Sequence, residues 1–338
     1  MISKDTTLIL SQDYELFFHR SGTIEKCLFE PCDALMRSAR EHGYKITFYV
    51  DAGMLCRMQA CAGSIRELAT DFDRIRRHLA ELVAANHDIG LHIHPHWEDT
   101  RFVDGRWAFE NTRYRLSEFS DVEAAEIVAR YVRILGEACG VAPTSYRAGG
   151  FCIEPFSKVA VALLDAGIDV DSSVVPGAYL KDSDKGFDFR GLGGPDWWYF
   201  EESPSIPKRQ GRFLEIPVTP MSMPFWYYWR RLFSKLGRHK EAVVFGDGSA
   251  KRIGKREVLR RLAGLSRVAE LSIDDPKANE LQRVTATKSA RRICHIMGHP
   301  KNLSIKSLLL LENLLTRQRA HYASVAGVAR RVRGGEFA

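Results

Sequence analysis

The chain has 338 residues, of which 45% are hydrophobic and 27% are charged. This composition is typical of a globular protein, and the length suits one large domain or two smaller ones. No segment approaches the roughly 18 consecutive apolar residues of a membrane-spanning helix, and the N-terminal sequence MISKDTTLIL lacks the pattern of a signal peptide. The composition therefore excludes an integral membrane protein built from apolar helices.

Charge and cysteine content further narrow the class of protein. The formal net charge is +7, and the stretch from Trp226 to Arg261 has eleven Lys/Arg against three acids, so the rest of the chain is near neutral. Nucleic-acid binders usually carry a more extended basic surface, and we expect no nucleic-acid partner. The seven cysteines are scattered and include no CxxC pair, which favours reduced thiols in the cytoplasm.

Short apolar strands and amphipathic helices alternate along the chain. The predicted strands cover residues 6–16, 45–53, 88–97, 145–151, 168–174, 212–220 and 293–300. The predicted helices cover residues 30–42, 71–85, 121–139, 154–166 and 304–321. Repeated strand–helix units imply a parallel sheet covered by helices, and six or seven such units can close into a barrel.

Residues 221–290 interrupt this alternation. The segment opens with the packed aromatics of FWYYW and continues as a basic, helix-biased stretch. We interpret residues 1–338 as a single barrel domain with this segment inserted. Three interpretations of the insertion stay open: a peripheral membrane contact through 225–240, a lid over the substrate groove, or a subunit contact. The oligomeric state is not predicted.

Polar side chains follow several of the predicted strands. In parallel α/β folds the carboxyl ends of the strands carry the chemistry, so these side chains are expected to meet at one mouth. They are Asp13, Glu15, His92, His94, His96, Arg147, Asp169, Asp171 and His299.

The spacing of the acids and histidines indicates a metal site. Asp13 and Glu15 are two residues apart on a strand and share one face. His92 and His96 are four apart, and Pro95 can turn the chain so that both rings reach one point. One carboxylate and two imidazoles are the ligand set of a catalytic zinc or a similar metal. His94 alternates onto the same face and is a third ligand, a substrate contact or a residue that supports the ligands.

These residues resemble the motifs of the polysaccharide deacetylases, the NodB-homology carbohydrate esterases. The resemblance implies a distorted (β/α)7 barrel, here with a basic, largely helical insertion. In the segment NHDIGLHIHPH the family's ligand pair matches His92 and His96. Asp13-Tyr14-Glu15 is similar to the family's first motif, with Asp13 as the catalytic base and Glu15 as a metal ligand, although the two roles are exchangeable.

The remaining motifs supply the other catalytic residues by the same resemblance. Arg147 matches the arginine that orients the base, with Gly149 and Gly150 where the family has a proline. His299 matches the general acid. The expected cofactor is one divalent metal ion, with zinc as the first choice. The residues expected to bind substrate are His94, Trp97, Trp197, Trp198 and Asp171, and Trp107 is a further aromatic able to stack on a sugar.

The leading hypothesis is a metal-dependent hydrolase that removes an N-acetyl or related acyl group from a sugar. We expect it to act in cytoplasmic biosynthesis of a surface polysaccharide, free in the cytoplasm or peripheral at the inner membrane, on a carbohydrate that is nucleotide- or lipid-linked. One alternative is hydrolysis of another non-peptide C–N bond on the same fold. The other is a glycan-binding relative without catalytic turnover.

Overall fold

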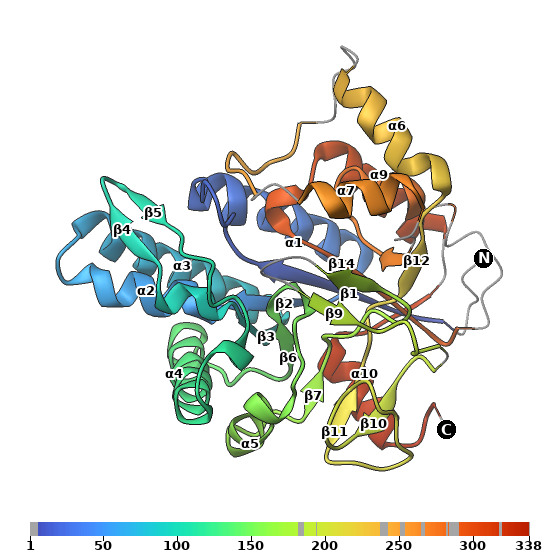
Figure 1. The fold of residues 1–338 in the computed structure, drawn as a ribbon, viewed down its shortest axis with the longest axis horizontal. Helices are drawn as coiled ribbons and strands as arrows, with labels where there is room; N and C mark the ends of the chain where they lie inside the picture. The colour runs from blue at the N-terminus through green and yellow to red at the C-terminus, as the bar shows by residue number, and fades with distance from the viewer. Residues whose placement is uncertain are drawn as a thin grey trace.

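The computed structural model describes residues 6–181, 186–193, 195–236, 243–250, 254–264, 268–281, 283, 291–317 and 320–337. Its centre is a curled sheet with seven parallel strands in the order β11-β7-β6-β3-β2-β1-β14 (Figure 1). The strands are β1 (Thr7–Tyr14), β2 (Ile46–Asp51), β3 (Asp88–Ile93), β6 (Tyr146–Ala148), β7 (Val170–Asp171), β11 (Phe213–Glu215) and β14 (Ile293–Gly298).

Backbone hydrogen bonds beyond β11 close this sheet into a distorted barrel. The amide of Thr219 donates to the carbonyl of His295 in β14 at 3.0 Å, and Leu271 donates to the carbonyl of Thr219 at 2.8 Å. Met297 in turn donates to Leu271 at 3.0 Å. The predicted barrel of seven strands is confirmed, although the closing contacts come from irregular chain rather than from a long strand.

The strands occupy a central position and are buried on both faces. Every residue of β1, β2 and β14 is buried, as expected for a parallel sheet enclosed between helices and a packed interior. The covering helices are α1 (Glu30–His42), α2 (Ala52–Ala62), α3 (Arg66–Ala84), α4 (Asp121–Cys139), α5 (Ser157–Asp165) and α9 (Ile305–Arg317) (Figure 1). The sequence did not predict α2.

Local signals explain where the helices begin and end. The Ser120 side chain caps α4 by accepting a hydrogen bond from the amide of Glu123, and the Glu123 carboxylate accepts one from the Ser120 amide. The helix stops at Gly140 in the left-handed conformation, as α1 stops at Gly43. These caps lie at the helix limits predicted from the sequence.

Helix α10 (Val325–Arg333) closes the amino end of the barrel. Its apolar face packs with buried residues of several strands, including Ile9 and Leu214. The amide of Ala326 donates to the carboxylate of Asp88, the first residue of β3, at 3.3 Å. The opposite, carboxyl end of the strands is thereby left for the functional site.

The smaller strands form hairpins and edges around the barrel. They are β4 (Arg101–Val103) with β5 (Arg106–Ala108), β8 (Tyr179–Lys181) with β9 (Gly186–Asp188), β12 (Pro220–Ser222) with β13 (Val268–Glu270), β10 (Trp198–Phe200) antiparallel to β11, and β15 (His321–Tyr322) beside β1. Among the described residues, no helix combines the length and apolarity needed to cross a membrane.

The segment 221–290 contributes two helices, α6 (Phe225–Leu236) and α7 (Lys255–Leu262), which pack against each other. Its described residues also include 271–274, which run beside β14 and join the barrel wall. Residues 237–242, 251–253, 265–267, 282 and 284–290 lie outside the described residues, so part of the predicted membrane contact through 225–240 does too. The boundaries of the insertion stay a prediction.

Candidate active site

The carboxyl ends of β1, β3, β6 and β14 surround a cavity of about 220 Å³. Parallel strands place their carboxyl ends at one edge of the barrel, which is why residues far apart in sequence meet there. The polar residues that line this cavity are Asp13, Glu15, His92, His94, Asn111, Tyr114, His299, Lys301 and Asn302. Five of the predicted site residues therefore share one cavity.

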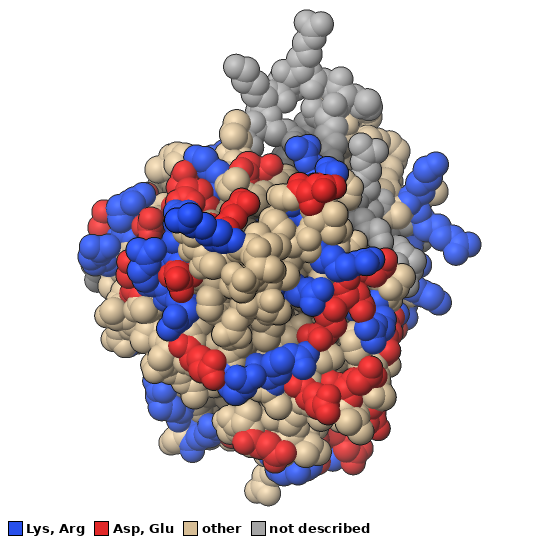
Figure 2. All heavy atoms as spheres, turned by 90° about the vertical axis from the view of Figure 1, so that its left-hand side faces the viewer, with Lys and Arg blue, Asp and Glu red and all other residues tan. Residues whose placement is uncertain are grey.

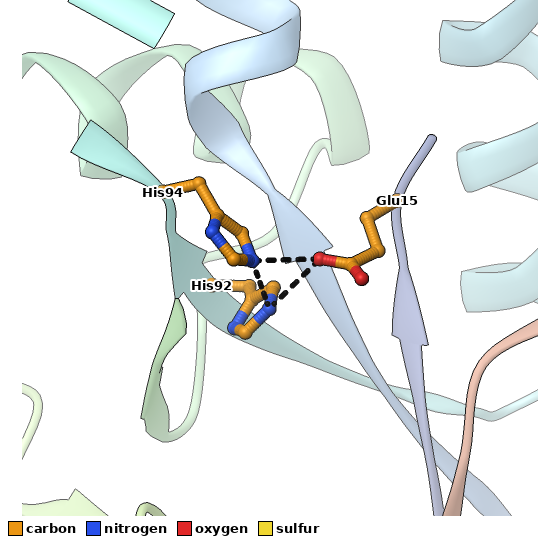
Figure 3. Close-up of side chains that lie close together, drawn as sticks. All are labelled: Glu15, His92 and His94. Carbon is orange, nitrogen blue, oxygen red and sulfur yellow. Dashed lines mark hydrogen bonds and ion pairs between the residues drawn. The ribbon is translucent and has the colours of Figure 1, made fainter. Parts of the chain in front are cut away.

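Glu15, His92 and His94 form the candidate metal centre (Figure 3). Oε2 of Glu15 lies 2.7 Å from Nε2 of His94 and 3.2 Å from Nε2 of His92, and the two histidine nitrogens are 3.1 Å apart. All three side chains are buried. One carboxylate and two imidazoles at this separation fit zinc and several other divalent metals.

The backbone of β6 orients His92 for such a role. Nδ1 of His92 lies 2.8 Å from the carbonyl oxygen of Arg147. Because a carbonyl only accepts, Nδ1 carries a proton, and Nε2 is the ring nitrogen that lies toward Glu15 and could bind a metal. This hydrogen bond to a ligating histidine is the usual outer support of a protein metal site.

The structure places His94 rather than His96 beside His92 and Glu15. Strand β3 ends at Ile93, and the 3-10 turn η2 (Pro95–Glu98) begins directly after His94. The turn carries the His96 ring away from the strand face and onto the ring of Tyr114, with the two centroids 5.4 Å apart and the planes 6° from parallel. His94 takes the place that the sequence analysis gave to His96.

The glycine pair after Arg147 makes room for His94. A Cβ atom on Gly149 would lie 2.5 Å from Nδ1 of His94 and 2.6 Å from the carbonyl oxygen of Ile93. Any larger residue at this position would push the ring out of the centre. The two departures from the family motif, the extra histidine and the missing proline, therefore have one steric explanation.

Lys301 holds the other oxygen of Glu15. Its Nζ donates to Oε1 of Glu15 at 2.8 Å and to the carbonyl of Leu16 at 2.6 Å, and it lies 4.9 Å from the ring centroids of Phe17 and Phe18. Burial alone would raise the pKa of Glu15, but Lys301 and the two imidazoles hold this pKa well below its usual value. Glu15 is thereby an anion with one oxygen directed at the histidines.

Asp13 is held by a different cation. Nη1 of Arg147 donates to Oδ1 of Asp13 at 2.6 Å, and both side chains are buried. Nε of the same guanidinium donates to the carbonyl of Ser172 at 2.9 Å, and its Nη2 donates to the hydroxyl of Ser11 at 3.0 Å. The other carboxylate oxygen of Asp13 faces the cavity, 3.8 Å from Nε2 of His92 and 3.6 Å from Nε2 of His299.

His299 enters the cavity with Asp274 behind it. Nδ1 of His299 donates to Oδ2 of Asp274 at 2.7 Å, and the backbone amide of His299 donates to Oδ1 at 2.7 Å. Burial opposes the charged imidazolium, but Asp274, Asp13 and Glu15 outweigh burial and raise the pKa of His299 to about 9. His299 is therefore set up to carry a proton on Nε2 toward the cavity.

Asp171, predicted to bind substrate, instead lies inside the barrel wall. The hydroxyl of Ser173 donates to its Oδ1 at 2.6 Å, and its carboxyl shares a hydrogen bond with Glu215. Burial raises the pKa of Glu215 well above its usual value, and the neighbouring Asp171 raises it further. The pair keeps a proton on Glu215. The other acid of this motif, Asp169, pairs with Arg333 of α10 at 2.7 Å.

The three tryptophans predicted to stack on a sugar are also placed elsewhere. Trp97 is buried and donates from Nε1 to Oδ2 of Asp51 at 2.6 Å. Trp198 is buried, with Nε1 donating to the carbonyl of Pro204 at 2.9 Å, and Trp197 packs with the apolar cluster around α10. The Gly/Pro content around Trp197 and Trp198 indicated a loop, but it did not indicate at which end of the barrel these tryptophans lie.

Sequence reasoning missed Asn111, Tyr114 and Asn302 of the cavity lining, and it also missed Lys301, Asp51 and Asp274. Lys301 follows His299 by two positions and was a near neighbour of a recognised motif. Asp51 ends β2 beside His92, and burial raises its pKa to about 7. Its position at the end of a predicted strand could have indicated a site residue. Asp274 lies within the segment interpreted as an insertion, and nothing in its sequence context indicates a site residue.

A larger groove of about 950 Å³ adjoins the cavity, since Phe18 and Asn111 line both. Trp107 and Phe109 lie in its lining together with Arg20, Arg106 and Glu110. Figure 2 faces the β4–β5 side of the molecule and shows basic and acidic side chains interspersed around stretches without charge. Trp107 is thus the predicted aromatic that remains close to the cavity.

Comparisons with known proteins give structural matches only. No family model matches the sequence, and no curated protein matches it. A protein from Mycobacterium smegmatis assigned as a polysaccharide deacetylase is 13% identical, with 91% of this chain and 78% of that chain covered and a TM-score of 0.45. One from Pseudomonas aeruginosa PAO1 with the same assignment is 14% identical over 95% and 90% of the two chains, with a TM-score of 0.46.

An allantoinase matches to a similar degree, with 14% identity over 96% of this chain and 91% of that chain and a TM-score of 0.46. Two of these three structures carry the name of the family whose motifs the sequence resembles. Likenesses at this level assign no activity to the chain.

Proposed function

We propose that the protein is a metal-dependent hydrolase that removes an N-acyl group, in the simplest case acetyl, from a sugar. The observation that carries the proposal is the meeting of three charged assemblies at one cavity. They are the Glu15–His92–His94 centre, the Asp13–Arg147 pair and the Asp274–His299 pair. Amide hydrolysis needs these three elements: an electrophilic centre, a base and an acid.

The candidate centre would hold the metal through Glu15, His92 and His94. When bound, a divalent ion supplies Lewis-acid polarisation of the acyl carbonyl and lowers the pKa of a nearby water. We assign the ligand role to Glu15 rather than Asp13 because Oε2 of Glu15 lies against both histidines. Asp13 has Arg147 on one oxygen and the cavity on the other, which suits a base.

The remaining side chains would manage the protons. Asp13 accepts a proton from the attacking water as the new C–O bond forms. His299 donates its Nε2 proton to the sugar nitrogen as the C–N bond breaks, and Asp274 stabilises the imidazolium before the transfer. The products are a carboxylic acid and a free amino sugar, with one water consumed.

The adjoining groove supports a carbohydrate as substrate. The half-buried ring of Phe109 suits the C–H face of a sugar, and Arg20, Arg106 and Glu110 can bond hydroxyl groups, whereas Trp107 is buried and reaches the groove only with its edge. The cavity is smaller than a drug-sized binding site, which starts at about 300 Å³, so it suits the acylated end while the groove holds the rest. We extend the proposal to a zinc-dependent reaction in cytoplasmic surface-polysaccharide biosynthesis.

The test is product analysis on the metal-loaded protein. A panel of N-acetylated sugars and oligosaccharides should yield acetate and free amine in equal amounts. Asp13→Asn should lower the rate by roughly 10²–10⁴-fold while metal content is retained. Amine formation without acetate would instead indicate another C–N bond. Sugar binding without turnover across the panel would indicate a glycan-binding protein, and in either case the proposed function would be wrong.

A further inference from the structure

Helix α6 carries large apolar side chains that face solvent. Trp226 and Phe233 are each 63% exposed, and Trp229 between them is 37% exposed. Their spacing of three and four residues places all three on one helical face. Tyr227, which points the other way, is buried against the rest of the molecule. An amphipathic helix normally directs such a face inward, so this exposure requires an explanation.

Helix α7 adds further exposed apolar side chains. It packs beside α6, and the indole nitrogen of Trp229 donates to the carbonyl of Leu262 at the end of α7 at 2.9 Å. Leu259 is 65% exposed and Val258 is 39% exposed. In Figure 1, α6 lies at the upper edge of the molecule and α7 lies below it. We call Trp226, Trp229, Phe233, Val258 and Leu259 the α6–α7 apolar surface.

The sequence that carries this surface is strongly basic, and the described part of α7 contains Lys255, Arg256, Arg260 and Arg261. Between Trp226 and Arg261 the sequence has eleven Lys/Arg and three acids. The resulting charge of this stretch, 11 − 3 = +8, exceeds the net charge of +7 of the whole chain. On α7, Lys255 and Arg256 are exposed and form no ion pair with any acid of the described residues. One of the three acids, Asp247, is occupied by hydrogen bonds from the amide and hydroxyl of Thr23 at 2.8 and 3.0 Å.

From this combination we propose that the α6–α7 apolar surface docks on an anionic lipid bilayer. Tryptophan and phenylalanine on one helical face, with Lys and Arg around them, are the features of helices that lie in the membrane interface. The aromatic rings enter the boundary between headgroups and acyl chains, while each nearby cation gains attraction to the negative surface. A second protein copy explains the apolar side chains less well, because two equally basic surfaces would repel each other.

The docking does not depend on the proposed reaction and is tested without it. Full-length protein is sedimented with vesicles of phosphatidylcholine alone, or of phosphatidylcholine and phosphatidylglycerol in equal parts. We expect binding to the anionic vesicles, weakened by salt, and little binding to the neutral ones. No binding to anionic vesicles, or equal binding to both kinds, overturns the proposal.

Matched variants distinguish binding through this surface from nonspecific binding. Trp226→Ser with Phe233→Ser should lower the affinity for anionic vesicles by roughly tenfold or more. The control variant, Val161→Ser with Leu309→Ser, removes apolar side chains of comparable exposure, 67% and 53%, from α5 and α9 and should bind like the parent. Lys255→Glu with Arg256→Glu should reduce binding by a similar factor, and unchanged melting temperatures verify folding.

Two outcomes would overturn the proposal in favour of another occupant. If the Trp226/Phe233 variant binds vesicles like the parent, the surface is not the contact. If the parent forms a concentration-dependent dimer in analytical ultracentrifugation that the same variant abolishes, and binds no vesicles, the surface joins two copies of the chain.

Discussion

Gly149 lies directly against the ring of His94, so that a Cβ atom on the glycine would come within 2.5 Å of Nδ1. We predict that Gly149→Ala displaces His94 and weakens metal binding by about 10–100-fold, the range typical of lost outer support around a metal. Isothermal titration with Zn²⁺ measures the effect. Gly63→Ala is the control, because nothing lies within 4 Å of the added methyl and the backbone there is helical.

The two histidines after β3 are expected to differ in their effect on metal content. His94→Ala removes a proposed ligand and should lower the amount of bound metal more than the loss of a residue that only supports a ligand does. Elemental analysis after dialysis measures the bound metal. His96→Phe keeps an aromatic ring against Tyr114 and should retain the metal. If the His96 variant loses metal and the His94 variant keeps it, the sequence-based assignment to His96 is the right one.

The Glu15–Lys301 pair is buried, so breaking it from one side should be costly. Lys301→Met leaves Glu15 without its closest cation, and we expect a loss of about 3–5 kcal/mol in the free energy of unfolding of the metal-free protein. The double variant Glu15→Gln/Lys301→Met removes both charges and should lose less than the sum of the single changes. Urea unfolding measures all three, and strictly additive losses would show that the two side chains act independently.

Asp274 should set the alkaline limit of activity through His299. The imidazolium of His299 is present below its pKa of about 9, so kcat/KM should fall as pH rises through this pKa in the free enzyme. Asp274→Asn removes the main group that raises the pKa, while burial continues to lower it, and the alkaline limb should move to lower pH. Asn302→Ala leaves the Asp274 charge in place and should shift the limb much less.

The Asp171–Glu215 pair should make the fold less stable at alkaline pH. The pKa of Glu215 is raised in the folded protein, so its stabilising contribution is complete below its ordinary value of 4.5 and is lost as pH rises through the folded pKa. Glu215→Gln keeps a hydrogen-bond donor beside Asp171 and cannot ionise. Its melting temperature should exceed that of the parent at pH values above the folded pKa and match it in mild acid; an equal difference at all pH values would contradict this account.

Several features were determined by the sequence alone. Apolar runs separated by capped amphipathic segments can bury their surface only as strands covered by helices, which is why the parallel barrel was predictable. Because parallel strands end at one mouth, Asp13, Glu15, His92, Arg147 and His299 could be placed together from their positions after predicted strands.

Other features depended on geometry that no local pattern encodes. The choice of His94 over His96 follows from a turn that begins at Pro95 and from the space at Gly149, and both concern the direction of a ring rather than its spacing. Trp197 precedes β10 and Trp198 begins it, and the pairing of β10 with β11 sets where both side chains lie.

Asp274 shows most clearly what local sequence patterns do not determine. It reaches His299 only because residues 271–274 return to β14 after some fifty residues of intervening chain and close the barrel there. Periodicity and motif spacing describe short-range preferences of the backbone, whereas this contact results from hydrogen bonds between segments that are distant in sequence. The tertiary structure alone therefore decided which acid stands behind the proposed proton donor.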